Sequence, residues 1–204
     1  MSFDSEAKYW DDNPKRNERA RTAAESIKKY LDKTNKPDAL DFGCGTGQLS
    51  VYLYDSLNNI TLLDSSAGMI DVLKEKIRKN GYTRMNPVCM ELTDPAQLEG
   101  EFDLVYTLMV LHHVRNCQEL LKIFYMKMRK NGRLVIIDLI REDGSFHAGR
   151  PDFTGHNGFD TGILAQDLQN IGFKNTECSI IYKNERIIND EVRIYPVFML
   201  SAQK

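Results

Sequence analysis

The sequence predicts an α/β fold in which a doubly wound, mostly parallel sheet is closed by an antiparallel hairpin at its C-terminal end. First, apolar runs of strand length alternate with amphipathic stretches between residues 37 and 140, the order typical of parallel strands joined by helices. Second, the first apolar run leads directly into a turn with three glycines. Third, the apolar runs 175–182 and 192–202 are separated by a polar stretch too short for a crossover helix, so these strands must be antiparallel.

The N-terminal part of the chain is predicted to form one helix ahead of the sheet. Asn13 and Pro14 mark its start, because asparagine caps helices well and proline is tolerated in a first turn. Residues 1–13 are polar and are expected to be poor in helix. The apolar residues that recur at helical spacing, and that should dock on the core, are Ala20, Ala23, Ala24, Ile27 and Leu31.

Strands and helices then follow one another in order. The expected strands are 38–42, 60–64, 86–90, 102–107 and 133–139, and the expected helices are 49–57, 67–80 and 118–130. Residues 141–159 break this alternation with several aromatic residues and glycines. An irregular stretch of this length in a compact domain indicates a functional lid or a binding loop.

The length of 204 residues suits a single domain. We expect this domain, 1–204, to consist of an N-terminal helical cap segment 1–36 and a catalytic core 37–204. The 27 Lys and Arg residues nearly balance the 29 Asp and Glu residues, which gives no field that would attract nucleic acid. The N-terminus lacks the basic and apolar regions of a signal peptide, and no apolar run is long enough to span a membrane. We therefore expect a cytoplasmic protein without nucleic-acid or membrane partners, and the sequence leaves monomer and homodimer both open.

The four cysteines are scattered without a Cys-x-x-Cys pair, so we expect reduced thiols that fill apolar space. The nearest approach to a metal site is His112 and His113 with Cys117. Neighbouring histidines on a strand or a helix point apart, and this spacing fits no structural zinc site. No metal is therefore expected.

The most informative motif is Asp41-Phe42-Gly43-Cys44-Gly45-Thr46-Gly47, at the end of the first predicted strand. Alternating glycines allow positive φ and close approach of a ligand, and the following helix offers unpaired N–H groups. Twenty-three residues after Asp41, the next apolar run ends in Asp64, which is placed to accept hydrogen bonds from a ribose diol. The pattern predicts a cofactor that contains adenosine. A dinucleotide turn would need a third glycine where this chain has Gln48.

The tighter turn resembles the first motif of the class I S-adenosylmethionine-dependent methyltransferases. Residues 101–114, which end in Leu-His-His-Val, look like the fourth strand of that family, and 128–138 look like its fifth-strand entry. Gly158-Phe159 and residues 168–173 resemble the later helix and the Gly-Phe entry to the sixth strand. The resemblance covers most of the chain and is strongest to the ubiquinone-biosynthesis type, which acts on small molecules.

This resemblance implies a Rossmann-like sheet of seven strands, S-adenosyl-L-methionine as cofactor and a small-molecule methyl acceptor. Asp64 would bind the ribose, although it could instead cap the next helix. Glu91 would accept from the adenine amino group, with Asp94 as a competitor. The complete set of cofactor-binding residues expected is Asp41, Gly43, Cys44, Gly45, Gly47, Asp64, Ser65, Met69, Glu91, Leu92 and Thr107.

Methyl transfer from a sulfonium needs placement and desolvation more than it needs a catalytic group, so a general base is optional. If the acceptor loses a proton, the candidate bases are His112, His147, His156 and Tyr9. His112 and His113 could also simply begin the helix after the fourth strand.

Absent motifs narrow the acceptor. The chain lacks the Asp/Asn-Pro-Pro-Tyr/Phe turn of amino-group methyltransferases that act on adenine or glutamine, and no cysteine follows a proline, as in cytosine-C5 enzymes. Residues 1–13 and 141–159 are the expected covers of the acceptor pocket, and their aromatic residues suit a small molecule. Two other functions stay open: a non-catalytic S-adenosylmethionine-binding sensor or partner protein, and a nicotinamide-dependent oxidoreductase.

Overall fold

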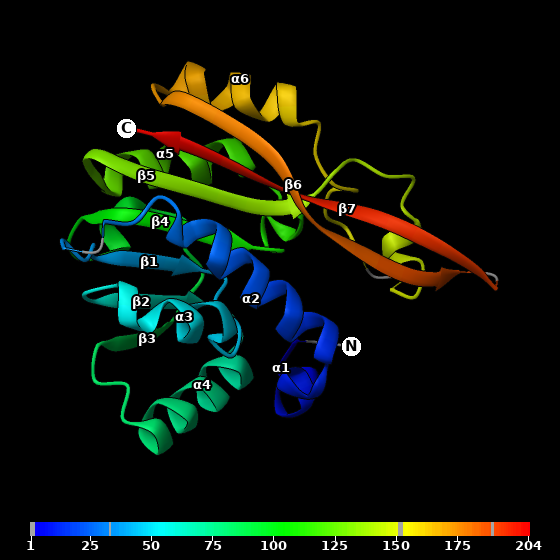
Figure 1. Ribbon diagram of the computed structural model, residues 1–204, viewed down its shortest axis with the longest axis horizontal. Coiled ribbons are helices and arrows are strands. Elements are labelled where there is room, and N and C mark those ends of the chain that lie inside the picture. Colours follow the sequence, from blue (N-terminus) through cyan, green and yellow to red (C-terminus); the bar gives the residue numbers. More distant parts are fainter. Residues whose placement is uncertain (1–2, 33, 151–152, 189) are drawn as a thin grey trace.

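The computed structural model describes residues 3–32, 34–150, 153–188 and 190–204. Its centre is a seven-stranded sheet in the order β3-β2-β1-β4-β5-β7-β6 (Figure 1). The first five strands are parallel, and β7 pairs antiparallel with both β5 and β6. The strands are β1 Ala39–Phe42, β2 Ile60–Asp64, β3 Met85–Cys89, β4 Phe102–Leu108, β5 Met128–Leu139, β6 Lys174–Ile188 and β7 Glu191–Gln203. The predicted sheet is confirmed.

Helices cover both faces of this sheet. The α-helices are α1 Phe3–Glu6, α2 Pro14–Lys28, α3 Gln48–Leu53, α4 Ala67–Asn80, α5 Cys117–Lys127 and α6 Thr161–Ile171. Short 3-10 helices are η1 Ala7–Asp12, η2 Tyr54–Ser56, η3 Pro95–Gln97, η4 Leu111–His113 and η5 Ser145–His147. None of the helices in the described ranges has the length and apolar character that a membrane span needs.

The core has two halves, because successive strand residues point to opposite faces of the sheet. Ala39 and Leu104 belong to the half that packs on α2, α3 and α4. Leu40 and Val105 belong to the half that packs on α5 and α6. Both faces of the central strands are thus buried, which explains why their sequences are almost continuously apolar.

The helices that the sequence predicted best are those whose start and end are specified by residues at the helix ends themselves. Asn13 accepts hydrogen bonds from the backbone N–H groups of Lys15 and Arg16, so α2 begins at Pro14 as expected. The Ser66 side chain accepts from Met69 N and caps α4, and Gly81 ends that helix with φ +70°. The range 67–80 is confirmed because both ends carry their own stop signals.

Long-range pairing overrides the sequence pattern in three places. The expected helix 118–130 ends at Lys127, because Met128 already pairs with Phe102 in the sheet. The two C-terminal strands extend to 174–188 and 191–203, so their hairpin projects beyond the sheet (Figure 1). The N-terminal segment, expected to be poor in helix, forms α1 and η1 beside the start of α4.

The chain returns from β3 on one side of β1 to β4 on the other, so the strand order reverses between β1 and β4. Helices leave these two strands towards opposite faces, and sheets of this kind bind their ligands outside the carboxyl ends of the strands at such a point. The glycine turn and the Leu-His-His-Val segment both follow these ends. The fold therefore places both motifs at the usual ligand site of such a sheet.

We predict that Gly43→Ala destabilises the protein more than Gly81→Ala. Both glycines have positive φ, +68° and +70°, so both variants carry the same backbone penalty of about 1 kcal/mol. A Cβ on Gly43 would lie 2.9 Å from Val110 Cβ and closer still to both valine methyl groups, whereas Gly81 has open space. Overpacking of this kind costs about 1–3 kcal/mol in addition. Urea unfolding measures the difference, and equal losses would show that the turn shifts freely.

Candidate functional site

The glycine turn is attached to the neighbouring strand by its backbone. Gly43 N and Cys44 N both donate to the carbonyl oxygen of Leu63 in β2, at 2.7 and 3.0 Å. Gly43, Gly45 and Gly47 all have positive φ, at +68°, +53° and +76°. These are conformations that side chains other than glycine rarely adopt, which is the physical reason for three glycines here.

Asp64 at the end of β2 holds the middle of this turn. Its Oδ2 accepts from Gly45 N at 2.8 Å, and its Oδ1 accepts from Ser66 N at 2.8 Å. The possibility that Asp64 caps α4 is wrong, since Ser66 occupies the cap position. Met69, in the first turn of α4, has its sulfur 3.9 Å from the position of a Cβ on Gly45. Ser65 is exposed beside them.

Asp41 lies beneath the turn and is only 2% exposed. Its carboxyl accepts from Ser50 Oγ at 2.6 Å, and the same Oγ lies 2.6 Å from Tyr106 Oη. Burial, aided by the charge of Asp64, raises the pKa of Asp41 to about 7, and the Ser50 hydrogen bond acts in the opposite direction. Asp41 therefore connects the end of β1 to Ser50 and, through Ser50, to Tyr106.

Two further predicted residues lie at the carboxyl ends of β1 and β4, the half-buried Cys44 and the buried Thr107. The Cys44 thiol has its pKa raised by burial and by the nearby charges of Asp41 and Asp64, so it is not a reactive thiolate. Thr107, in β4, is fully buried, and its hydroxyl has no hydrogen-bond partner within the described part of the chain.

The segment after β3 contains the two acids considered for the adenine. The Asp94 carboxylate caps η3 by accepting from Ala96 N at 2.7 Å, and Gln97 completes a capping box. Glu91 is exposed two residues after β3, and Leu92 is buried next to it. Asp94 already has a structural task, which leaves Glu91 as the better candidate.

The N-terminal segment covers the glycine turn. The indole Nε1 of Trp10 lies 3.8 Å from the position of a Cβ on Gly45. Asp11 accepts from Thr46 Oγ1 at 2.5 Å and forms an ion pair with Lys76 at 2.6 Å. η1 is therefore attached directly to the turn and to α4.

Asp4 makes a second attachment at the start of α4. Its Oδ1 accepts from Ser66 Oγ at 2.6 Å and from Gly68 N at 2.8 Å. These two hydrogen bonds lower the pKa of Asp4. An acid at a helix N-terminus also interacts favourably with the helix dipole.

The two predicted covers are in contact. Glu6 of α1 forms an ion pair with Arg150 at 2.5 Å, and Arg150 also lies over the Phe3 ring. Phe3 packs edge-on against both Trp10 and His113, with ring centroids 5.9 and 5.3 Å apart. The N-terminal segment thus connects the glycine turn with the end of β4 and with the 141–159 loop.

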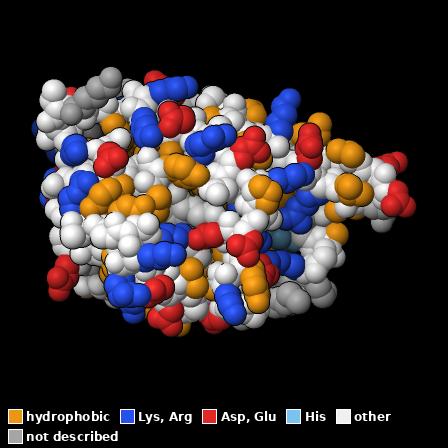
Figure 2. All heavy atoms as spheres, turned by 60° about the horizontal axis from the view of Figure 1, so that its bottom comes forward, with side chains coloured by type: hydrophobic (Ala, Val, Ile, Leu, Met, Phe, Trp, Pro, Cys, Tyr) orange, Lys and Arg blue, Asp and Glu red, His pale blue; other side chains and the backbone are white. Residues whose placement is uncertain are grey.

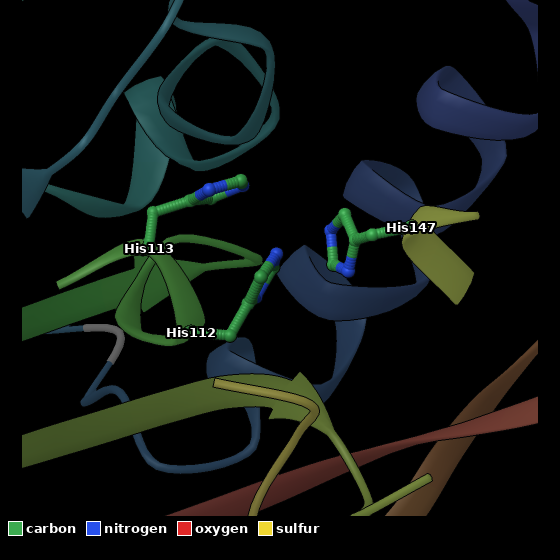
Figure 3. A group of neighbouring side chains, drawn as sticks. All are labelled: His112, His113 and His147. Atoms are coloured by element: carbon green, nitrogen blue, oxygen red, sulfur yellow. The ribbon is translucent and has the colours of Figure 1, made fainter. Parts of the chain in front are cut away.

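Three histidines gather at this junction. His112 and His113 lie on η4, and His147 lies on η5 (Figure 3). Each offers a ring nitrogen, and these nitrogens all lie within 4.8 Å of one another. The rings of His112 and His113 have centroids 4.2 Å apart, so the expectation that neighbouring histidines point apart is wrong. The 3-10 turn of η4, rather than a regular strand or helix, brings them together.

Asp138 fixes the orientation of His112. Its Oδ1 lies 2.5 Å from His112 Nδ1, and its Oδ2 accepts from His112 N at 3.2 Å. Both side chains are buried, at 0% and 1% exposure. Asp138 is not among the residues that the sequence motifs predict for the site. A carboxylate that directly follows the apolar run 134–137 is the signal that could have identified it.

Burial, aided by the His112 ring, lowers the pKa of His113 to about 3 and that of His147 to about 4. The guanidinium of Arg150 acts in the same direction. Both rings are therefore neutral near pH 7. Figure 2 shows a histidine at the floor of a hollow beside the projecting hairpin, with Lys and Arg side chains around it.

The other two candidate bases lie outside this cluster. The Tyr9 side chain is 62% exposed. His156 has its Nε2 2.9 Å from the carbonyl oxygen of Val114 and 3.5 Å from the Cys117 sulfur. Neither Tyr9 nor His156 belongs to the cluster of His112, His113 and His147.

The chain is similar in sequence to known methyltransferases. A family model described as a methyltransferase domain matches residues 15–178. An uncharacterised methyltransferase of Schizosaccharomyces pombe is 33% identical over 154 residues, covering 69% of this chain and 52% of that protein. The mitochondrial ubiquinone biosynthesis O-methyltransferase of Saccharomyces cerevisiae is 29% identical over 127 residues, covering 60% of this chain and 40% of that protein. The chain thus spans about half or less of the length of these relatives.

Solved structures share the fold. A S-adenosylmethionine-dependent methyltransferase from Aquifex aeolicus superposes with a TM-score of 0.70 at 16% identity, covering 98% of this chain and 97% of that chain. A putative methyltransferase from Bacillus halodurans gives a TM-score of 0.69 at 16% identity, covering 90% and 98%. At this identity the likeness is one of fold.

We predict that Asp41→Asn flattens the pH dependence of stability. The folded-state pKa of about 7 lies above the usual value of 3.8, so the folded state binds the proton more tightly. The stability that this proton contributes is lost as pH rises from about 4 through 7, at about 1.4 kcal/mol per unit of raised pKa. Asparagine keeps an acceptor for Ser50 without that loss.

Urea unfolding of parent and variant at pH 5 and pH 8 measures this effect. The variant should gain stability relative to the parent as pH rises. His113 and His147 have lowered pKa values and act in the opposite direction, but they are the same in both proteins and cancel in the difference. A difference that stays constant with pH would show that Asp41 is ionised in the folded protein throughout.

Proposed function

The chain belongs to the methyltransferase domain family, and we propose that it transfers the methyl group of S-adenosylmethionine to a small-molecule acceptor. The observation that carries the proposal is the contact between Asp64 and Gly45 at the point where strand order reverses. It joins an acid, suited to a ribose diol, to a turn whose peptide planes a ligand can approach. The relatives that are named ubiquinone biosynthesis O-methyltransferase and coclaurine N-methyltransferase support a small-molecule acceptor.

The hydrogen-bonding capacity of Asp64 supports its role with the ribose. A carboxylate has about four lone-pair sites, and the backbone N–H groups of Gly45 and Ser66 occupy two of them. Two remain for the ribose hydroxyls. In this proposal Glu91 accepts from the adenine amino group, the Leu92 backbone N–H faces the ring, and Met69 packs on the cofactor.

The charge around the turn supports S-adenosylmethionine over a dinucleotide. Asp64 and Asp11 place carboxylates beside the turn, and the nearby Lys76 is already paired with Asp11. This arrangement is unfavourable for a pyrophosphate. It suits a cofactor whose sulfonium and ammonium groups are positive.

The reaction is an in-line displacement at the methyl carbon. A bond forms between an acceptor heteroatom and this carbon while the carbon–sulfur bond breaks, and the electron pair of that bond stays on sulfur as S-adenosylhomocysteine. We place the acceptor at the junction of the two covers, among Phe3, Trp10 and the three histidines, where closely packed rings would limit the access of water. His112 and His147 are the remaining candidates to take a proton from the acceptor.

We further propose that residues 1–204 act as one domain in the cytoplasm, without a nucleic-acid partner. The net charge of −2 gives no attraction to nucleic acid. The free thiols of Cys44, Cys89, Cys117 and Cys178 suit a reducing compartment.

We predict that S-adenosylhomocysteine raises Tm and that NAD does not. A ligand at 100 times its dissociation constant stabilises by about 2.7 kcal/mol. For a protein of this size each kcal/mol corresponds to about 2–4 °C. Differential scanning calorimetry with each ligand makes the test. A response to NAD alone would support the oxidoreductase instead. Binding of S-adenosylmethionine without methyl transfer to any metabolite of a cell extract would support the sensor.

We predict that Asp64→Asn weakens S-adenosylhomocysteine binding about 5- to 150-fold, as expected for the loss of 1–3 kcal/mol from a charged acceptor. Asparagine keeps one acceptor oxygen, whereas alanine would also release Gly45 and Ser66 and would loosen the turn itself. Asp71→Asn, an exposed acid on α4, is the matched control. Isothermal titration calorimetry gives the affinities. Equal affinity in the Asp64 and Asp71 variants would place the ribose elsewhere.

A further inference from the structure

We propose that His112, His113 and His147 bind a divalent transition-metal ion, with Zn²⁺ the best match, and leave one coordination position open. Their ring nitrogens lie within 4.8 Å of one another, and the rings turn towards a common space in Figure 3. The three ring centroids are separated by 4.2, 5.2 and 5.7 Å. Three imidazoles with a vacant fourth position are the ligand set of catalytic zinc sites.

The contact between His112 and Asp138 gives the first ligand its orientation. With Nδ1 bonded to the Asp138 carboxylate, Nε2 is the nitrogen of His112 left for an ion. Asp138 is itself held, because it also accepts from the backbone N–H groups of His112 and Leu139. A carboxylate behind a metal-binding histidine fixes the tautomer and raises the basicity of the ligand nitrogen.

His147 supplies an independent observation. The residue is only 8% exposed, and its Nδ1 is buried with no hydrogen-bond partner within the described residues. A buried polar group without a partner costs about 1–3 kcal/mol. If the His147 ring moved slightly and bound the metal ion, the ion would be the partner that this buried ring lacks.

The cluster needs only a modest contraction to close on an ion. Zinc–nitrogen bonds of about 2.0–2.1 Å place ligand nitrogens roughly 3.4 Å apart in a tetrahedral site. His112 is fixed by Asp138, whereas His147 is carried by the irregular 141–159 segment and can approach it. The Phe153 ring, stacked on His147 with centroids 3.7 Å apart, would move with it.

The surrounding charges indicate what the open position binds. The guanidiniums of Arg150 and Arg186 act on His147, and the carboxylate of Asp138 acts in the opposite direction. Arg150 is paired with Glu6, and Arg186 donates to the carbonyl oxygen of Phe146. An ion beside two guanidiniums is more stable with an anionic fourth ligand.

We therefore assign the fourth position to an ionised oxygen of the methyl acceptor, a step that rests on the proposed function. The acceptor hydroxyl would bind the ion and release its proton to solvent, because a bound cation lowers the pKa of the hydroxyl. The oxygen would then form its bond to the methyl carbon while the carbon–sulfur bond breaks towards sulfur. No histidine needs to act as a base in this sequence.

The first experiment measures Zn²⁺ binding to chelator-treated full-length protein by isothermal titration calorimetry. We expect one ion per chain. Binding should weaken at least 10-fold in His113→Gln and His147→Gln, and about 10- to 100-fold in Asp138→Asn, which acts through His112. His156→Gln is the matched control, since that ring bonds to Val114 and Cys117 instead, and it should bind as the parent does.

Co²⁺ as a spectroscopic probe separates this site from the cysteines. We expect d–d bands of a nitrogen-ligated tetrahedral site that disappear in His147→Gln, without a thiolate charge-transfer band. S-adenosylhomocysteine affinity within about threefold of the parent in every variant shows that the fold is intact. Zinc binding that is absent, or unchanged in the histidine variants, overturns the proposal and leaves the histidines as candidate bases.

The two proposals can fail separately. Zinc binding without S-adenosylhomocysteine binding would contradict the proposed function and support the metal site. Methyl transfer that is unchanged after chelation, in a protein shown to lose its zinc, would overturn the assignment of the open position. Activity that is lost on chelation and restored by Zn²⁺ in the parent, but not in His147→Gln, supports it.

Discussion

The site depends on the end of β2 holding the turn that follows β1. The Leu63 carbonyl accepts two backbone N–H groups of the turn, and the Asp64 carboxylate accepts a third from Gly45. Three consecutive residues of the turn, Gly43 to Gly45, are thereby fixed, and both glycines have the positive φ that glycine adopts most readily. Asp64 also accepts from Ser66 N, so the same carboxylate joins the turn to the residue that caps α4. The groups that would meet the cofactor are thus aligned before any ligand arrives.

The N-terminal segment uses the same framework. Asp4 attaches it to Ser66 and Gly68, and Asp11 attaches it to Thr46 and Lys76. Trp10 then lies over Gly45. In the proposed site the cofactor would therefore lie beside the indole. The hydrogen bonds of Asp4 and Asp11 and the ion pair with Lys76 hold the segment in this place.

The sequence could predict those parts of the fold whose signals are local. β2 and α4 have the predicted limits because a short apolar run, the Ser66 cap and Gly81 specify them without outside help. The end of α5 could not be predicted, because Met128 leaves the helix to pair with Phe102. The histidine cluster shows the same limit, since no pattern reveals that His147 lies beside His112, 35 residues earlier. The roles of the predicted cofactor residues stay predictions, although the turn and Asp64 lie together as those roles require.

The glycines of the 141–159 segment, one of the two proposed covers of the acceptor, limit where this segment can change. Gly155 and Gly158 press against the carbonyl oxygens of His112 and Ile140, so a side chain at either position would collide with backbone. His156 N and Phe159 N donate to the carbonyl oxygens of His112 and Leu139 and join the same half of the segment to the sheet. Gly149, by contrast, has open space around it. Libraries that aim to broaden the acceptor range should therefore vary the surroundings of Gly149 and the N-terminal aromatic residues, and should leave the second half of the segment unchanged.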